Sequence, residues 1–132
     1  MAEAMVDNLG NSSQVFKLIF AAGSQLHGAD GPFLSNADIN FGTAANKTLA
    51  EIMTSYWISF TVTLDPNPLR RATAPFWPSY AAGGNVTATG VTGDSIGFSV
   101  LDVTTSSIQE IRDPDESAQC DFFSSKAYAI RN

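Results

Sequence analysis

Two stretches of hydrophobic residues have the pattern of β-strands. Residues 15–22, with the sequence VFKLIFAA, form a short and almost continuous apolar run rich in β-branched and aromatic side chains. Such a run is typical of a strand that is covered on both faces, as in parallel sheets. Residues 95–103, SIGFSVLDV, alternate instead, with apolar side chains at positions 96, 98 and 100. This alternation predicts a strand with one buried face.

A third stretch has helical periodicity and predicts a long amphipathic helix over residues 48–62. Its apolar residues recur at intervals of three and four and form one stripe, which we expect to pack in the core. The stripe comprises Leu49, Ile52, Met53, Tyr56, Trp57 and Phe60. Thr48 and Glu51 fit a capping box at the start of this helix. We expect it to end at DPNP, residues 65–68, because proline lacks an amide hydrogen and disfavours helix in the residue before it.

The length and composition indicate one globular domain. The chain has 132 residues, of which 44% are hydrophobic and 15% charged, and it shows neither an internal repeat nor a linker. We expect residues 1–14 to be a poorly ordered lead-in and residues 15–132 to form the folded part. No apolar run approaches the roughly 20 residues of a membrane-spanning helix.

The charge argues against a nucleic-acid partner. The net charge is −6 and the isoelectric point is about 4.4. Nucleic-acid backbones attract clusters of lysine and arginine, and Arg70 and Arg71 are the one adjacent basic pair. The N-terminal segment MAEAMVDNLG is acidic and lacks the basic residues of a signal peptide, so the location of this chain stays open.

The single histidine is the first candidate for chemistry. His27 lies in the glycine-containing segment GSQLHGADGPF, directly after the first predicted strand. An imidazole on a loop beyond a strand end can exchange protons near neutral pH and be reached by a substrate. A surface histidine without a catalytic role fits the same position.

A second candidate is Ser95, because residues 93–97, GDSIG, match the G-x-S-x-G pattern of a nucleophile elbow. That elbow requires a helix after the serine and a histidine later in the chain. Here a strand pattern follows Ser95, and His27 precedes it. We therefore interpret the match as accidental, and a self-contained hydrolase that uses Ser95 and His27 is the least favoured alternative.

No metal or cofactor is expected. Asp113, Asp115 and Glu116 are adjacent acidic residues on a predicted loop, and a solvated surface is the simplest interpretation of such a group. Spacings that bind metals, such as C-x-x-C or H-E-x-x-H, are absent from the sequence.

Glycosylation motifs and the cysteine count give conflicting indications of a secretory origin. Asn11, Asn46 and Asn85 each begin an N-x-S/T motif and are predicted N-glycosylation sites. Cys120 is the single cysteine, whereas a secreted protein rarely leaves one thiol unpaired. A buried, inert thiol is the alternative interpretation.

Four segments together resemble the C-terminal portion of type-B carboxylesterases. They are LHGAD at 26–30, SYWISFTVTLDPNP at 55–68, FWPSY at 76–80 and AQCDFF at 118–123, and they lie in the order found in that family. The family includes cholinesterases and fungal lipases and esterases and has the α/β-hydrolase fold. The resemblance extends over residues 15–123, most of the chain.

The resemblance implies roles for particular residues. His27 takes the place of the catalytic histidine, the general base of a Ser-His-Glu/Asp triad. Asp30 takes an acidic position three residues later, where we expect structural support of the histidine loop, as we do for Gly28. Cys120 takes the place of a cysteine that bridges to one upstream of the histidine. Leu64 departs from the glycine usual before Asp-Pro-Asn in this family.

The family's nucleophile, triad acid and oxyanion loop all precede the histidine, and 26 residues precede His27 here. We therefore expect an incomplete α/β-hydrolase fold: one or two strands, a long amphipathic helix and irregular loops, the last quarter of a secreted esterase that acts on small-molecule esters. The isolated chain is expected to be inactive and marginally stable. The alternative is a non-catalytic binding module, or a subunit completed by a partner chain at its exposed sheet edge.

Overall fold

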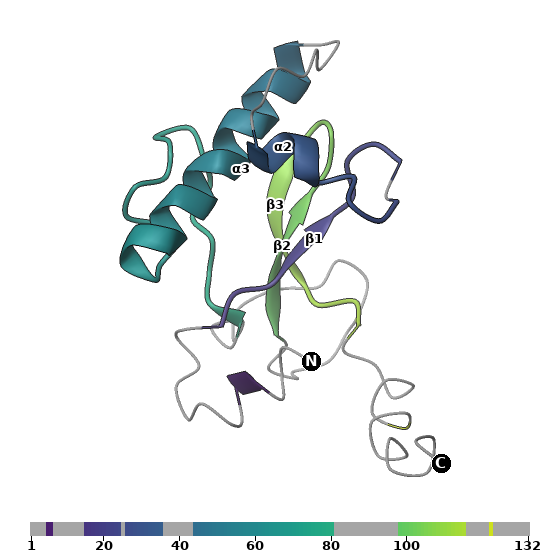
Figure 1. The fold of residues 1–132 in the computed structure, drawn as a ribbon. Coiled ribbons are helices and arrows are strands. Elements are labelled where there is room, and N and C mark those ends of the chain that lie inside the picture. Colours follow the sequence, from purple (N-terminus) through teal and green to yellow (C-terminus); the bar gives the residue numbers. More distant parts are fainter. Residues whose placement is uncertain are drawn as a thin grey trace, which may run out of the picture.

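A three-stranded mixed sheet and two helices make up the regular elements of the described residues (Figure 1). The computed structural model describes residues 5–6, 15–24, 26–35, 44–80, 98–115 and 122. The elements in chain order are β1 (Leu18–Phe20), α2 (Gly31–Ser35), α3 (Ala44–Thr63), β2 (Ser99–Val103) and β3 (Ile108–Arg112). The described residues thus combine a mixed sheet with helices, and they contain three strands where the sequence predicted one or two.

β1 confirms the strand predicted from the apolar run. It pairs in parallel with β2, in a register that places Leu18 opposite Leu101 and Phe20 opposite Val103. A parallel neighbour is what a strand with apolar residues on both faces predicts. The expectation of full coverage is wrong, however, because all three residues of β1 are half-buried. The strand order β1-β2-β3 places β1 at an edge of the described sheet, which accounts for that exposure.

β2 is the central strand, and both of its faces are covered. Leu101 and Val103 pack in the cluster beneath α3, whereas Val100 packs on the opposite face of the sheet. Ser99, on the face predicted to be solvated, is fully buried, and its hydroxyl donates a hydrogen bond of 2.6 Å to Oε1 of Glu110. The prediction of one buried face is therefore wrong, because side chains pack against both faces of β2.

β3 runs antiparallel to β2 and was not predicted from its sequence. A short turn joins the two strands. The Thr104 amide donates to the Ser107 carbonyl at 2.9 Å, and the Thr104 hydroxyl accepts a hydrogen bond from the Ser107 amide at 2.9 Å. The Thr104 hydroxyl thus helps to close a connection that contains neither of the residues, glycine and asparagine, that usually mark such a turn.

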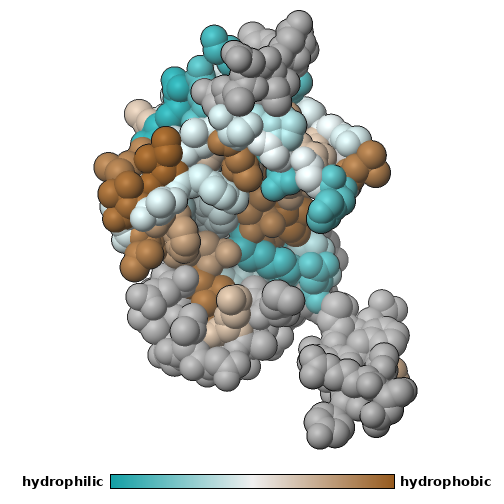
Figure 2. All heavy atoms as spheres, in the orientation of Figure 1, coloured by the Kyte–Doolittle hydropathy of each residue, from teal (hydrophilic) through white to brown (hydrophobic). Residues whose placement is uncertain are grey.

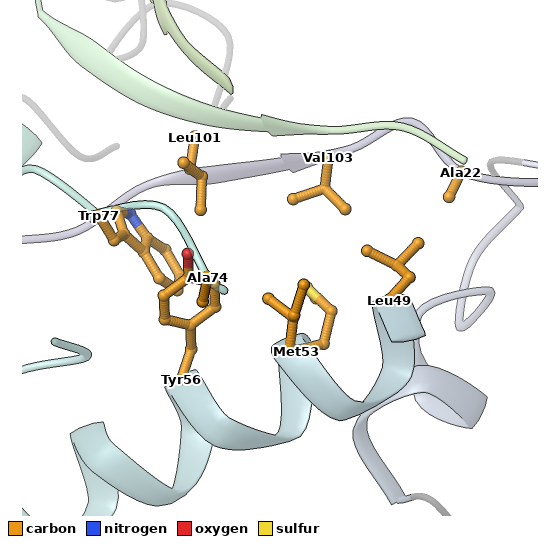
Figure 3. Packing of buried hydrophobic residues seen from close by; sticks show 9 residues of the cluster. Ala22, Leu49, Met53, Tyr56, Ala74, Trp77, Leu101 and Val103 are labelled. Carbon is orange, nitrogen blue, oxygen red and sulfur yellow. The ribbon is translucent and has the colours of Figure 1, made fainter. Parts of the chain in front are cut away.

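α3 lies across one face of the sheet (Figure 1) and supplies four of the nine buried residues of the main core. Figure 3 shows Met53 and Tyr56 pointing from the helix towards the sheet, where β2 contributes Leu101 and Val103. The hydroxyl of Tyr56 donates to the Pro75 carbonyl at 2.6 Å, and burial raises the pKa of this phenol to about 12.

Two predictions about α3 are wrong. The helix begins at Ala44, one turn before Thr48, so Thr48 lies within it and caps no helix start. Alanine is the best helix former, and the pair Ala44–Ala45 extends the helix beyond the apolar stripe. The stripe itself is buried from Leu49 to Tyr56, but Trp57 and Phe60 are 39% and 42% exposed.

The end of α3 confirms the predicted role of the Asp-Pro-Asn segment. Leu64 adopts a left-handed conformation, with φ of 61°, and its amide donates to the Phe60 carbonyl at 2.8 Å. This is the position after a helix end where glycine is favoured. Asn67 is buried, and its side-chain amide donates to the Trp77 carbonyl and accepts from the Trp77 amide, each at 2.8 Å. The asparagine thus joins the helix end to the segment FWPSY.

Candidate functional site

His27 lies on the loop that follows β1, at the end of the strand where the sequence placed it. The loop begins while the chain is still attached to the sheet, because the Ala21 amide donates to the Val103 carbonyl at 2.7 Å. Gly23 then adopts a positive φ of 71°, which directs the backbone away from the strand. The His27 side chain is exposed to solvent.

The histidine occupies a tight turn that its glycine neighbour makes possible. The Ala29 amide donates to the Leu26 carbonyl at 2.9 Å, so His27 and Gly28 are the two central residues of a β-turn. Gly28 has a φ of 78°, and His27 is not among the residues with positive φ. This combination defines a type II turn, which favours glycine at its third position. Gly28 therefore stabilises the turn that sets the direction of the His27 side chain.

Asp30 connects this turn to α2 through its backbone. Its carbonyl accepts hydrogen bonds from the amides of Phe33 at 2.9 Å and Leu34 at 3.2 Å, which starts the helix. Its side chain lines an apolar hollow beside β1. Among the described residues, neither the Asp30 carboxylate nor the His27 imidazole has a side-chain hydrogen bond or ion pair. The imidazole is therefore open to a partner from solvent or from another segment.

An aromatic hollow of about 420 Å³ lies between β1, α3 and the segment that contains Trp77. Three rings meet around Trp77: their centroids lie 5.2 Å (Tyr56), 5.8 Å (Trp57) and 6.1 Å (Phe16) from it. The hollow is lined by Phe16, Leu18, Phe20, Asp30, Tyr56, Trp57, Phe60, Pro66 and Trp77. It explains the exposure of Trp57 and Phe60, because these side chains form a wall that nothing in the described residues covers.

A charged cluster that the sequence patterns did not predict joins the residue before β1 to the loop after β3. The Lys17 ammonium donates to both carboxylate oxygens of Asp113, at 2.8 and 2.7 Å, and to Asp115 at 2.8 Å. The Tyr80 hydroxyl donates to the same Asp113 carboxylate at 2.6 Å. The Asp113 side chain is 1% exposed and that of Asp115 is 70% exposed.

The expectation of a solvated acidic loop is therefore wrong for Asp113 and right for Asp115. Burial by itself favours the neutral forms of Asp113 and Lys17, but their hydrogen bonds outweigh it. The pKa of the Asp113 carboxyl is lowered by hydrogen bonds from Lys17 and Tyr80, and the pKa of Lys17 is raised by the two carboxylates. A lone lysine within an apolar strand was the available signal, since a buried charge requires a partner.

The other candidate residues are less informative. Asn46 lies in the first turn of α3 and is half-buried. Four candidates lie outside the described residues: Asn11, Asn85, Ser95 and Cys120. In the part of the chain that the structure describes, no group of three or more His, Cys, Asp or Glu side chains is placed to hold a metal ion, and no helix has the length and apolarity to cross a membrane.

The sheet, the long helix and the loop between them match part of an esterase fold. The match is with the crystal structure of Aspergillus niger EstA, an esterase, which superposes with a TM-score of 0.67 at 22% sequence identity. The alignment covers 99% of this chain and 25% of that protein, so the chain spans a quarter of its structural relative. No protein-family model and no curated protein matches the sequence.

Proposed function

We propose that residues 15–132 are the C-terminal segment of a secreted serine carboxylesterase of the type-B family, in which His27 is the general base. It would accept the proton of a serine hydroxyl and return it to the leaving alcohol. The serine, the triad acid and the oxyanion donors would come from polypeptide outside these 132 residues. The substrates would be small carboxylic esters, and no cofactor is needed.

The position of His27 carries the proposal. A type II turn presents an exposed imidazole just beyond the end of β1, within a segment that superposes on a quarter of an esterase. A general base must be reachable by substrate and by its nucleophile, and it must be held in a defined direction. The turn keeps the His27 imidazole exposed and fixes its direction. Its ring nitrogens have no side-chain partner among the described residues and can therefore bind the serine hydroxyl.

A chimaera tests the role of His27. The quarter of Aspergillus niger EstA that superposes on this chain is replaced by residues 15–132, and hydrolysis of p-nitrophenyl butyrate is measured. We expect a His27→Gln substitution to lower kcat by a factor of about 10⁴ or more, because loss of a triad member removes most of the catalysis. A Ser95→Ala substitution is the matched control and should leave the rate unchanged. An active chimaera that tolerates His27→Gln would refute the assignment.

The isolated chain provides a second, independent result. We expect it to show no triad-dependent turnover and no covalent labelling by a fluorophosphonate probe, because the nucleophile is absent. Labelling of Ser95, together with turnover abolished by His27→Ala, would replace the proposal with the self-contained hydrolase.

The remaining roles follow from the same proposal. Asn11, Asn46 and Asn85 would carry N-linked glycans in the secreted parent, and Cys120 would form a disulfide with an upstream cysteine. The alternative function, a subunit completed by another chain, is favoured by one observation: the aromatic hollow and the adjacent edge of β1 are uncovered among the described residues.

A further inference from the structure

The sequence of β1 is that of an interior strand, although the strand lies at an edge. Leu18 and Phe20 pack towards the cluster beneath α3, whereas Ile19 packs towards the cluster on the opposite face. Apolar residues on both faces are typical of strands that are flanked by other strands and covered on both sides. All three residues are nevertheless half-buried. The apolar residues on both faces of β1 are therefore those of an interior strand in a sheet larger than the one described.

One hydrogen-bonding edge of β1 has no partner strand among the described residues. The Lys17 carbonyl accepts from Leu101 at 3.1 Å and the Ala21 amide donates to Val103 at 2.7 Å, so these odd-numbered positions face β2. Successive residues of a strand direct their amides and carbonyls to opposite sides. The amides and carbonyls of Leu18 and Phe20 therefore point away from β2, and no described strand pairs with them.

The described residues lack the usual protection of an edge strand. Natural edges are protected by lysine, by proline, by a bulge or by a covering segment, since an open edge invites pairing with another chain. Lys17 is the one charged residue in the run from 15 to 22, but its ammonium is held by Asp113 and Asp115. The charge that would repel a pairing strand is therefore neutralised by this chain itself.

The aromatic hollow lies beside this open edge of β1. Phe16, Leu18 and Phe20 line it from β1 and the residues just before it, while Trp57 and Phe60 line it from α3. Among the described residues that line it, Asp30 is the one that carries a charge. The surface beside the open edge is thus apolar, and exposed apolar surface of this kind marks an interaction site. Figure 2 shows that other hydrophobic side chains are exposed over the C-terminal turns of α3, but Ile58 and Val62, which are exposed on that helix, do not line the hollow.

We propose that the open edge of β1 and the aromatic hollow form one docking surface for a second polypeptide that carries the rest of an esterase-like fold. A strand of that partner pairs with Leu18 and Phe20, and its apolar side chains fill the hollow between Phe16, Trp57 and Phe60. The choice of partner rests on the alternative form of the proposed function, a subunit completed by another chain, and on the superposition, which covers 25% of the esterase chain. Strand addition supplies affinity through the main chain, and the hollow supplies selectivity.

Binding to a truncated esterase tests this surface. The probe is Aspergillus niger EstA without the quarter that superposes on this chain, and light scattering after size exclusion measures complex formation. The positive control is the removed quarter of EstA itself. We expect a 1:1 complex between the probe and this chain, which calorimetry then quantifies.

Three variants identify the contact. Leu18→Pro removes one outward amide without touching the bonds to β2, and Trp57→Glu places a charge in the hollow; each should weaken binding by about tenfold or more. Ile58→Glu, on the same helix but outside the hollow, is the matched control and should change affinity by less than about twofold. Leu18→Lys repeats the edge test with an intact backbone, and circular dichroism confirms that each variant is folded.

Several results would overturn the docking surface. In the first, the truncated EstA binds the removed quarter of EstA but does not bind this chain. In the second, a complex forms but neither Leu18→Lys nor Trp57→Glu weakens it. In the third, this chain associates with itself instead of binding the probe. Ester hydrolysis by the complex separates this inference from the proposed function. Binding that depends on β1 without turnover that depends on His27 refutes the catalytic role alone, whereas the reverse result refutes the docking surface alone.

Discussion

Replacing Asp113 by asparagine should destabilise the fold far more than the same change at Asp115. Asp113 is buried, and its carboxylate accepts hydrogen bonds from Lys17, from Tyr80 and from the Asp115 amide at 3.0 Å. Asparagine keeps the size but leaves the ammonium without its closest charge. Breaking a buried ion pair costs about 3–5 kcal/mol. Lys17 is 24% exposed and keeps Asp115, which reduces the expected loss to about 2–3 kcal/mol.

Asp115 is the matched control for this measurement. Its side chain is 70% exposed, and a pair of that kind is worth about 1 kcal/mol or less. The free energy of unfolding is measured by urea titration of the wild type, Asp113→Asn and Asp115→Asn. A double variant, Lys17→Met with Asp113→Leu, should be more stable than Asp113→Leu alone, because it also removes the partly buried ammonium that has only the exposed Asp115 left as a carboxylate partner.

The pH dependence follows from the two shifted groups. The pKa of Asp113 is lowered in the folded state from its ordinary value of 3.8, so its contribution is complete above that value and is lost as the pH falls through the folded pKa. The pKa of Lys17 is raised above 10.5, so its contribution is complete below that value and is lost as the pH rises through the folded pKa. Stability from this cluster should be constant between about pH 4 and 10. Equal losses for Asp113→Asn and Asp115→Asn, or an unchanged acid limb in Asp113→Asn, would refute this reasoning.

Two further predictions concern backbone conformation. Leu64→Gly should stabilise the chain by about 0.5–1 kcal/mol, because φ of 61° strains leucine but not glycine; a lowered melting temperature would show that the exposed leucine side chain is needed elsewhere. Gly28→Ala should cost about 1 kcal/mol, because φ of 78° strains alanine, whereas Gly31→Ala, which meets open space without a positive φ, is the control. Equal melting temperatures for these two alanine variants would contradict the type II turn at His27.

Local sequence patterns predicted the elements whose determinants lie close together in the chain. The apolar run of β1, the helical periodicity of α3 and the proline-containing helix end depend on residues within one or two turns of one another. The position of His27 beyond a strand end was predictable for the same reason. The strained Leu64 follows this rule as well, since its departure from glycine was visible before its φ of 61° was known.

Features that depend on distant partners were not predictable in this way. Lys17 and Asp113 are 96 residues apart, so nothing near either one distinguishes the buried Asp113 from its exposed neighbour Asp115. The burial of Ser99 depends on β3, whose sequence IQEIR gives a weak strand signal, and on Glu110 across the ladder. A period-two pattern assumes one solvated face, and β2 has none.

The wrong prediction that the whole apolar stripe of α3 is buried has a different cause. The helical periodicity was correct, but the described residues do not cover the C-terminal part of the stripe. Leu49, Met53 and Tyr56 find β2 and are buried, whereas Trp57 and Phe60 continue the same pattern into an open hollow. A helix gains nothing from exposing two large aromatic residues at core spacing. β1 shows the same mismatch on the neighbouring element, with an interior sequence at an edge. Two independent patterns, one helical and one extended, thus predict further apolar contacts at the same place, which the described residues do not supply and where the proposed partner would dock.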